Sequence, residues 1–263
     1  MVRGLDVFRD WFRDFTDKYI LIGGTAADAA MAEAGEDFRA TKDLDIILVV
    51  GELDAAFIAV IRDFVEAGRY EQRTKSDGTP CLYRFSHPED DSFPSMLEFF
   101  SLVPDGLEIE GLGHLAPIPT DEPGVSLSAI LLDPDYYGFA LSGRYESNGL
   151  TRLRQEYIIP LKARAFLDLS ARRERGEPVQ SHDIRKHRAD VFRLFRIVDP
   201  EQRPQLPGSV VEDLAQFLNV VQETDLDPRR FGYRDRSLAD VCSEIREHYG
   251  LPGPSTVSLS NDS

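Results

Sequence analysis

The stretch over residues 19–50, YILIGGTAADAAMAEAGEDFRATKDLDIILVV, constrains the fold more than any other part of the chain. An apolar run at 19–22 predicts a buried strand, and the glycine pair after it predicts a tight turn into a helix over about 26–33. A loop follows, and then a second apolar run that carries two acids predicts another strand. Strand, turn, helix and strand in this order indicate an α/β fold built around a sheet.

The second strand carries Asp43 and Asp45, separated by one residue. Because side chains alternate between the two faces of a strand, both carboxylates point to one face, whereas Leu44 and Ile46 point to the other, into a core. Two carboxylates held side by side repel each other unless a cation lies between them. The pair therefore predicts a metal site, although D-x-D alone is also a common solvated pair.

The glycine pair, Gly23 and Gly24, lets the backbone approach a ligand closely, and the helix after it offers free N–H groups to an anion. Alone, Gly-Gly after a strand is usually only a tight turn. Beside the acids it predicts a phosphate site next to a metal site, with the Thr25 hydroxyl as a further phosphate contact. Arg39 and Lys42 precede the acids, where they either steady a triphosphate or only offset charge.

Length and composition exclude several classes of protein. The 263 residues suffice for one large or two modest domains. No apolar run approaches the ~18 residues of a membrane helix, and the N-terminus lacks a signal region. Cys81 and Cys242 lie far apart and outside any metal-ligand spacing. We therefore expect a cytoplasmic protein with reduced thiols and no membrane partner.

The net charge of −16 argues against a general nucleic-acid binder, because phosphate contacts dominate that affinity. The charge is uneven, however. Residues 151–198 carry 12 Lys and Arg against 6 Asp and Glu, or +6, which leaves −22 for the rest of the chain. Such a segment either meets a polyanion or forms an ordinary solvated helix surface.

Hydrophobic periodicity predicts the other elements, with Trp11 in the core and with His87 and His114 as structural or surface residues. Amphipathic helices are expected at 4–18, 54–67, from about 160 onward, at 181–198, 209–221 and 237–249. Strands are expected at 81–85 and 96–103, a strand or another buried segment at 125–132, and turns with short strands at 133–150. The chain between residues 70 and 150 thus reads as mostly β.

One of these strands, at 96–103, contains a single acid, Glu98, within an apolar run. A carboxylate there would be costly to bury without a partner. The simplest explanation is that Glu98 faces Asp43 and Asp45 as a third metal ligand. The alternative is a glutamate on an edge strand that points to solvent.

The helix expected from residue 181 carries a polar stripe. Asp183, Lys186, His187 and Asp190 fall at i, i+3, i+4 and i+7, which places them on one face. The stripe is either part of a site or a charge-paired solvent face.

The order of these motifs, with TKDLDI at 41–46, resembles the signature of the DNA polymerase β-type nucleotidyltransferase superfamily. That superfamily has a third acid on a later strand, a position that Glu98 would match. The later sequence resembles the AbiEii-type toxins and related hypothetical nucleotidyltransferases, whose helical part carries a K-x-x-A helix and then an R/K-D-x-x-D helix. Lys162 in KARA and Asp190 in KHRAD match these motifs.

This chain departs from the AbiEii-type pattern in two ways. His187 stands where the family more often has Asp, and an insertion at 172–180 separates the two motifs. Asp183 therefore rivals Asp190 for the acidic role.

The resemblance covers about residues 19–195 and implies an α/β (α+β) fold. A polymerase β-like core with a short mixed sheet would occupy 1–150, followed by a helical domain at 151–250 and a disordered tail at 251–263. It implies transfer of a nucleoside monophosphate from an NTP to tRNA or protein, by the toxin of a toxin–antitoxin pair with a cognate antitoxin. The alternatives are an aminoglycoside-like small-molecule nucleotidyltransferase and an inactive binding protein of the same fold.

The same resemblance implies the site residues. The three acids would hold Mg²⁺ or Mn²⁺. The glycine turn and the cations would hold the β- and γ-phosphates, and an acid of the later helix would orient the acceptor or the base. The metal ligands would be Asp43, Asp45 and Glu98, the nucleotide contacts Gly23, Gly24, Thr25, Lys42, Lys162 and Lys186, and the orienting acid Asp190 or Asp183.

Overall fold

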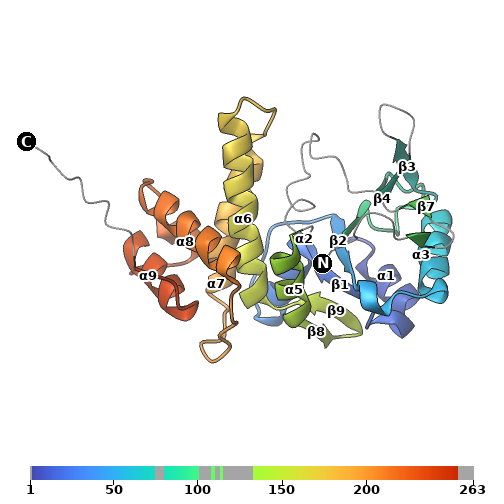
Figure 1. Cartoon of the computed structure of the whole chain (residues 1–263), viewed down its shortest axis with the longest axis horizontal. Helices are drawn as coiled ribbons and strands as arrows, with labels where there is room; N and C mark the ends of the chain where they lie inside the picture. The colour runs from blue at the N-terminus through green and yellow to red at the C-terminus, as the bar shows by residue number, and fades with distance from the viewer. Residues whose placement is uncertain (1, 75–79, 101–107, 110–112, 115–132, 254–263) are drawn as a thin grey trace, which may run out of the picture.

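The structure is a computed structural model that describes residues 2–74, 80–100, 108–109, 113–114 and 133–253 (Figure 1). A seven-stranded mixed sheet lies between helices on both of its faces. The expected α/β class with a mixed sheet is therefore confirmed. The strand or buried segment expected at 125–132 and most of the tail expected at 251–263 lie outside the described residues.

The strands of the sheet follow the order β3-β4-β5-β2-β1-β9-β8. β2 is parallel to β5 and β1 is parallel to β9, whereas the other neighbours are antiparallel. The strands are β1 Tyr19–Ile22, β2 Asp43–Leu48, β3 Glu71–Thr74, β4 Pro80–Ser86, β5 Met96–Phe100, β8 Arg144–Ser147 and β9 Leu150–Leu153, with β6 Glu108–Ile109 and β7 Gly113–His114 as a separate pair. The strands expected at 19–22 and 81–85, and the one beginning at residue 96, are confirmed.

The helices at the expected places are also present, and α2 starts earlier than expected because it includes the glycine pair. The helices are α1 Leu5–Phe12, α2 Gly23–Glu33, α3 Ala55–Ala67, α5 Pro134–Ser142, α6 Gln155–Glu174, α7 Ser181–Phe195, α8 Gly208–Gln222 and α9 Leu238–His248. Figure 1 shows α6 to α9 gathered at one end of the molecule and the sheet at the other.

Alternate side chains of the central strands enter two separate cores. In β1, Tyr19 and Leu21 pack on the face covered by α1 and α3. Ile20 and Ile22 pack on the opposite face, in the larger core that α2 and α5 to α9 share. The period of two residues along a strand thus assigns each side chain of the sheet either to the α1 and α3 side or to the helical side.

The expectation that Trp11 lies in the core is wrong. Its side chain is 37% exposed and meets Phe64 only by a ring edge, at 5.6 Å between ring centroids. Phe8 and Phe12, on the same helix, are each 1% exposed. Helical spacing identified the apolar face of α1 correctly, but Trp11 lies at the margin of that face.

The expectation of turns and short strands at 133–150 is wrong for residues 134–142, which form α5. The Asp133 side chain caps this helix by accepting from the backbone N–H of Asp135 at 2.9 Å, and Pro134 stands at the first helical position. Both are normal helix-start signals. Short strands occur only after the helix, in the hairpin of β8 and β9.

The helix expected to start near Pro160 starts at Gln155, so the proline lies inside α6. Pro160 has no N–H to donate to the carbonyl of Glu156, four residues earlier. The Tyr249 hydroxyl donates to that carbonyl instead, at 2.7 Å. The end of α9 thus supplies the hydrogen bond that lets α6 continue through the proline.

The sheet extends past residue 150, since β9 pairs with β1 within the stretch expected to be helical. The division into two domains stays a prediction. Within the described parts of the chain, no helix is both long and apolar enough to cross a membrane.

We expect Phe217→Ala to destabilise the protein by roughly 3–5 kcal/mol, because it empties a fully buried aromatic position on α8. The ring of Phe217 lies edge-on to Phe166, with centroids 5.2 Å apart. Val220→Ala on the same helix is the control, since Val220 is 38% exposed and its truncation should change stability by about 0.5 kcal/mol or less. Urea unfolding measures both, and equal losses would contradict this packing.

Candidate active site

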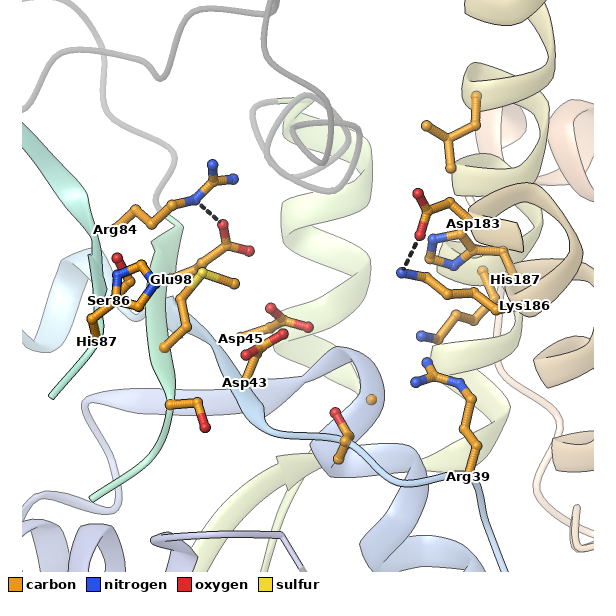
Figure 2. A pocket seen from close by; sticks show the side chains of 16 residues that line it. Arg39, Asp43, Asp45, Arg84, Ser86, His87, Glu98, Asp183, Lys186 and His187 are labelled. Carbon is orange, nitrogen blue, oxygen red and sulfur yellow. Dashed lines mark hydrogen bonds and ion pairs between the residues drawn. The ribbon is translucent and has the colours of Figure 1, made fainter. Parts of the chain in front are cut away.

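A cavity of about 530 Å³ lies between the sheet and helices α6 and α7 (Figure 2). Strands β2, β4 and β5 form one wall, and α6, α7 and the loop before β2 form the other. Six of the residues predicted from the sequence as metal or nucleotide contacts line it, namely Gly24, Asp43, Asp45, Glu98, Lys162 and Lys186. Residues from widely separated parts of the chain therefore meet at one place.

The acidic wall follows from the strand period. Leu44 and Ile46 of β2 are fully buried on the α1 and α3 side, so Asp43 and Asp45 lie on the helical side. The parallel register of β2 and β5 sets Asp45 directly beside Glu98. In Figure 2 the two aspartates project from their strand into the cavity. The three predicted acids thus share one face of the sheet.

The carboxylates of this wall are difficult to ionise together. Burial, followed by the charge of Glu98, raises the pKa of Asp45 to about 7. Burial also raises the pKa of Asp43, against the opposing charges of Lys186 and Lys42. Burial raises the pKa of Glu98 too, although Arg84 opposes the shift. Such crowding favours either a bound proton or a bound cation.

Arg84 was not predicted from the sequence. It lies on β4 opposite Glu98, both side chains are buried, and its guanidinium forms an ion pair with the Glu98 carboxylate. A signal existed, because Arg84 interrupts the apolar run CLYRF much as Glu98 interrupts MLEFF. Two opposite charges within two apolar strand candidates are a reason to expect a cross-strand pair.

Carboxylate oxygens are the ligands that Mg²⁺ and Mn²⁺ prefer, and a divalent cation would relieve the repulsion that raises the pKa of Asp45. Among the described residues, however, no group of three or more His, Cys, Asp and Glu is arranged to hold a metal. The donor chemistry fits a metal held by Asp43 and Asp45, and Glu98 would join once its carboxylate leaves Arg84.

The glycine turn packs against the site's own side chains. Gly23 has a φ of +65°, and a Cβ there would lie 1.8 Å from Oδ2 of Asp45. A Cβ on Gly24 would lie 2.6 Å from the Thr41 hydroxyl. The absence of side chains at both positions is therefore needed for Asp45 and Thr41 to come this close to the start of α2.

Two predicted nucleotide contacts lie differently from the prediction. The buried hydroxyl of Thr25 donates to the backbone carbonyl of Asp43 at 2.8 Å, so it supports the acidic strand. Lys42 is exposed and is not among the residues that line the cavity, although its charge acts on Asp43.

The opposite wall is cationic and depends on Asp190. This carboxylate is fully buried and contacts Arg39 from the loop before β2, at 2.9 Å, and Lys162 of α6, at 3.3 Å. Asp190 is not among the residues that line the cavity, whereas both of its cations are. These contacts indicate that Asp190 positions the two cations. Arg39, whose role the sequence did not decide, is therefore part of the cationic wall.

The α7 stripe also reaches the cavity, because Asp183, Lys186 and His187 line it. Lys186 contacts Asp183 at 2.8 Å within the helix. His87, expected as a structural or surface residue, is exposed and also lines the cavity, while its ring contacts Glu71 at 3.2 Å.

Burial controls the ionisation of this wall. It lowers the pKa of Lys162, with Asp190 acting in the opposite direction. It also lowers the pKa of His187 well below its usual value, helped by the charges of Lys162, Lys186 and Arg39. The imidazole is therefore neutral near pH 7.

Known proteins add no information about this site. No protein-family model matches the chain, and neither a curated protein nor a solved structure matches it.

We expect Asp190→Asn to cost about 3–5 kcal/mol of stability, because it removes the charge that compensates the buried Lys162 and the half-buried Arg39. Asp183→Asn on the same helix is the matched control, since its ion pair is more exposed and should contribute about 1 kcal/mol or less. Urea unfolding of both variants checks this, and a small effect at Asp190 would contradict its role in holding Arg39 and Lys162.

We expect Asp45→Asn to gain stability relative to the wild type as pH rises from about 4 to about 7, in metal-free buffer. A carboxyl whose pKa is raised by folding stabilises the native state below its unfolded pKa, and that contribution is lost as pH rises through the folded value. The difference should reach on the order of 4 kcal/mol above pH 7. Unfolding measured across this range tests it, and a difference that is independent of pH would contradict the burial of Asp45.

Proposed function

We propose that this protein is a metal-dependent nucleotidyltransferase that moves a nucleoside monophosphate from an NTP to an acceptor. The observation that carries the proposal is the pairing of two walls across one cavity. Asp43, Asp45 and Glu98 form an acidic wall, and Lys162 and Lys186 belong to the cationic wall opposite. A triphosphate with its divalent cation carries both signs of charge, as the cavity does.

The cations supply the binding side of this chemistry. Arg39 and Lys162, held by Asp190, and Lys186 line the wall that faces the acids. Charged side chains in a cavity shielded from bulk water attract phosphate more strongly than they would at an open surface. In the proposed complex these side chains contact the β- and γ-phosphates, beside the start of α2 at Gly24.

The acids supply the reacting side. A metal held by Asp43 and Asp45, with Glu98, would polarise the phosphoryl oxygens and stabilise the charge that develops on them. An acceptor hydroxyl oxygen bonds to the α-phosphorus, the bond from that phosphorus to the bridging oxygen breaks, and pyrophosphate leaves. The acceptor's proton leaves to water in the cavity, because the carboxylates of the acidic wall would be occupied by the metal.

The proposed acceptor is a hydroxyl of tRNA or of a protein. This protein would then be a toxin that an antitoxin inhibits. Ion pairs weaken the case for a large RNA acceptor, because much of the basic segment at 151–198 is paired with carboxylates of the same chain. Arg152 contacts Glu33, Arg164 contacts Asp213 and Arg196 contacts Glu36, so these charges are already compensated. A small acceptor is the second candidate, favoured by a cavity of about 530 Å³, within the usual size of small-molecule sites.

We expect the purified protein, with Mg²⁺ and an α-labelled NTP, to release pyrophosphate and to label an acceptor. Asp43→Ala with Asp45→Ala should lower transfer by a factor of about 100 or more, because it removes the charges that hold the metal. Each NTP is tested with total RNA, with bacterial protein and with aminoglycosides. Asp63→Ala on α3 is the matched control, since Asp63 is an exposed acid far from the cavity.

The outcomes separate the candidate functions. Label in RNA or protein, lost in the double variant and kept in the control, supports the toxin-like transferase. Label only in a small cationic acceptor supports the second candidate. Metal-dependent NTP binding without turnover points to an inactive binding protein, and no NTP or metal binding at all refutes the proposal.

A further inference from the structure

The cationic wall contains one polar side chain without a partner. Arg39 and Lys162 each contact Asp190, and Lys186 contacts Asp183. His187 lines the same cavity, and its Nδ1 atom is buried without a hydrogen-bond partner among the described residues. A buried polar atom without a partner destabilises the empty cavity, so a ligand that supplies a partner would recover that loss.

The position of His187 is set by its helix. It lies one turn after Asp183 and next to Lys186 on α7, and Figure 2 shows its ring beside both, on the wall opposite the aspartates. Helical spacing therefore keeps the imidazole at the cavity while the outward side of α7 carries His182, which is largely exposed.

We infer that His187 is a further phosphate contact, which takes up a proton when a polyphosphate fills the cavity. The inference rests on the proposed function, because it assumes that the cationic wall binds phosphates. It adds a residue and a proton to that binding, and neither follows from the transfer reaction itself.

The charges around the ring determine whether the imidazole of His187 carries a proton. In the empty cavity, burial and the positive charges of Lys162, Lys186 and Arg39 lower the pKa of His187, so the ring is neutral. A bound polyphosphate brings several negative charges to the same place and offsets those of the three cations. The positive form of the ring is then favoured, and both of its nitrogens become donors to phosphate oxygens.

The other charged groups at the cavity are paired or lie away from the ring, so they do not cancel the effect of a bound polyphosphate. Asp183 and Asp190 on α7 are occupied by Lys186, Lys162 and Arg39, and Arg84 on β4 is paired with Glu98. The acids of the sheet lie on the opposite wall. The charged and titratable groups that line the cavity with the ring are Asp183 and Lys186 from α7, Lys162 from α6, Arg39 from the loop before β2, and Asp43, Asp45, Arg84, His87 and Glu98 across the cavity.

Isothermal titration calorimetry with inorganic tripolyphosphate and Mg²⁺ tests the inference near pH 7, in two buffers that differ in ionisation enthalpy. The dependence of binding enthalpy on the buffer gives the number of protons exchanged. His187→Gln should take up fewer protons than the wild type, by up to about one, because a single imidazole is removed. Protons exchanged by Asp45 or by the ligand cancel in this difference.

The matched control is His248→Gln on α9, which should take up as many protons as the wild type. Like His187, His248 has a buried ring nitrogen without a partner among the described residues and a pKa lowered by burial, but it does not line the cavity. His187→Asn is a second variant should the glutamine variant fold poorly. The ratio of wild-type to variant affinity should fall by up to about tenfold per pH unit as pH rises towards the pKa of the bound ring, because protons exchanged by Asp45 or by the ligand cancel in the ratio.

The results distinguish the inference from the proposed function. Binding by the wild type and His187→Gln with equal proton exchange, or with an equal difference at His248→Gln, overturns the inference and leaves the function standing. Absence of binding of both tripolyphosphate and every NTP to the wild type refutes the proposed function, and the inference with it.

Discussion

The buried carboxylate of Asp190 is the interaction on which the candidate site depends. It joins α7 to α6 through Lys162 and to the loop before β2 through Arg39, a residue 151 positions earlier in the chain. Ions buried in this way cost several kcal/mol each in lost hydration, and apolar contacts would hold helices to a sheet more cheaply. The cluster is therefore better explained by its effect on the cavity, where it holds two cations facing the acids.

The location of the cavity follows from the point at which the apolar core ends. On the helical face of the sheet, Ile47 and Phe100 belong to the large core shared with α6 to α9. Towards the start of the same strands, the positions on that face are Asp43, Asp45 and Glu98. Because these side chains are polar, the helices cannot pack closely against the sheet there, and the structure leaves a cavity instead of a continuous core. The acids thus determine both the shape and the charge of the site.

The spacing of residues along single strands predicted the three acids of the site. The period of a strand placed Asp43 and Asp45 on one face, and the cost of burying a lone acid singled out Glu98. The pair of Glu98 with Arg84 had a sequence signal, because each charge interrupts an apolar strand run. The contact of Asp190 with Arg39 depends on how distant segments pack, which no spacing encodes. The same limit explains Trp11, because helical periodicity gives the direction of a side chain but not where the opposing surface ends.

The two walls together explain why the proposed chemistry needs a cation. A polyphosphate alone would gain at Lys162 and Lys186 but would be repelled by the acids opposite. In the proposed complex a divalent cation would accompany it, so that the acids would bind the cation, the lysines would bind the phosphates, and both walls would favour binding. The charge count of the basic segment points the same way, since the pairs of Arg152, Arg164 and Arg196 with carboxylates leave less positive charge on the surface than the sequence suggests. Attraction for phosphate is therefore concentrated in the cavity, which favours a compact, metal-bound triphosphate over a long polyanion as the ligand of this wall.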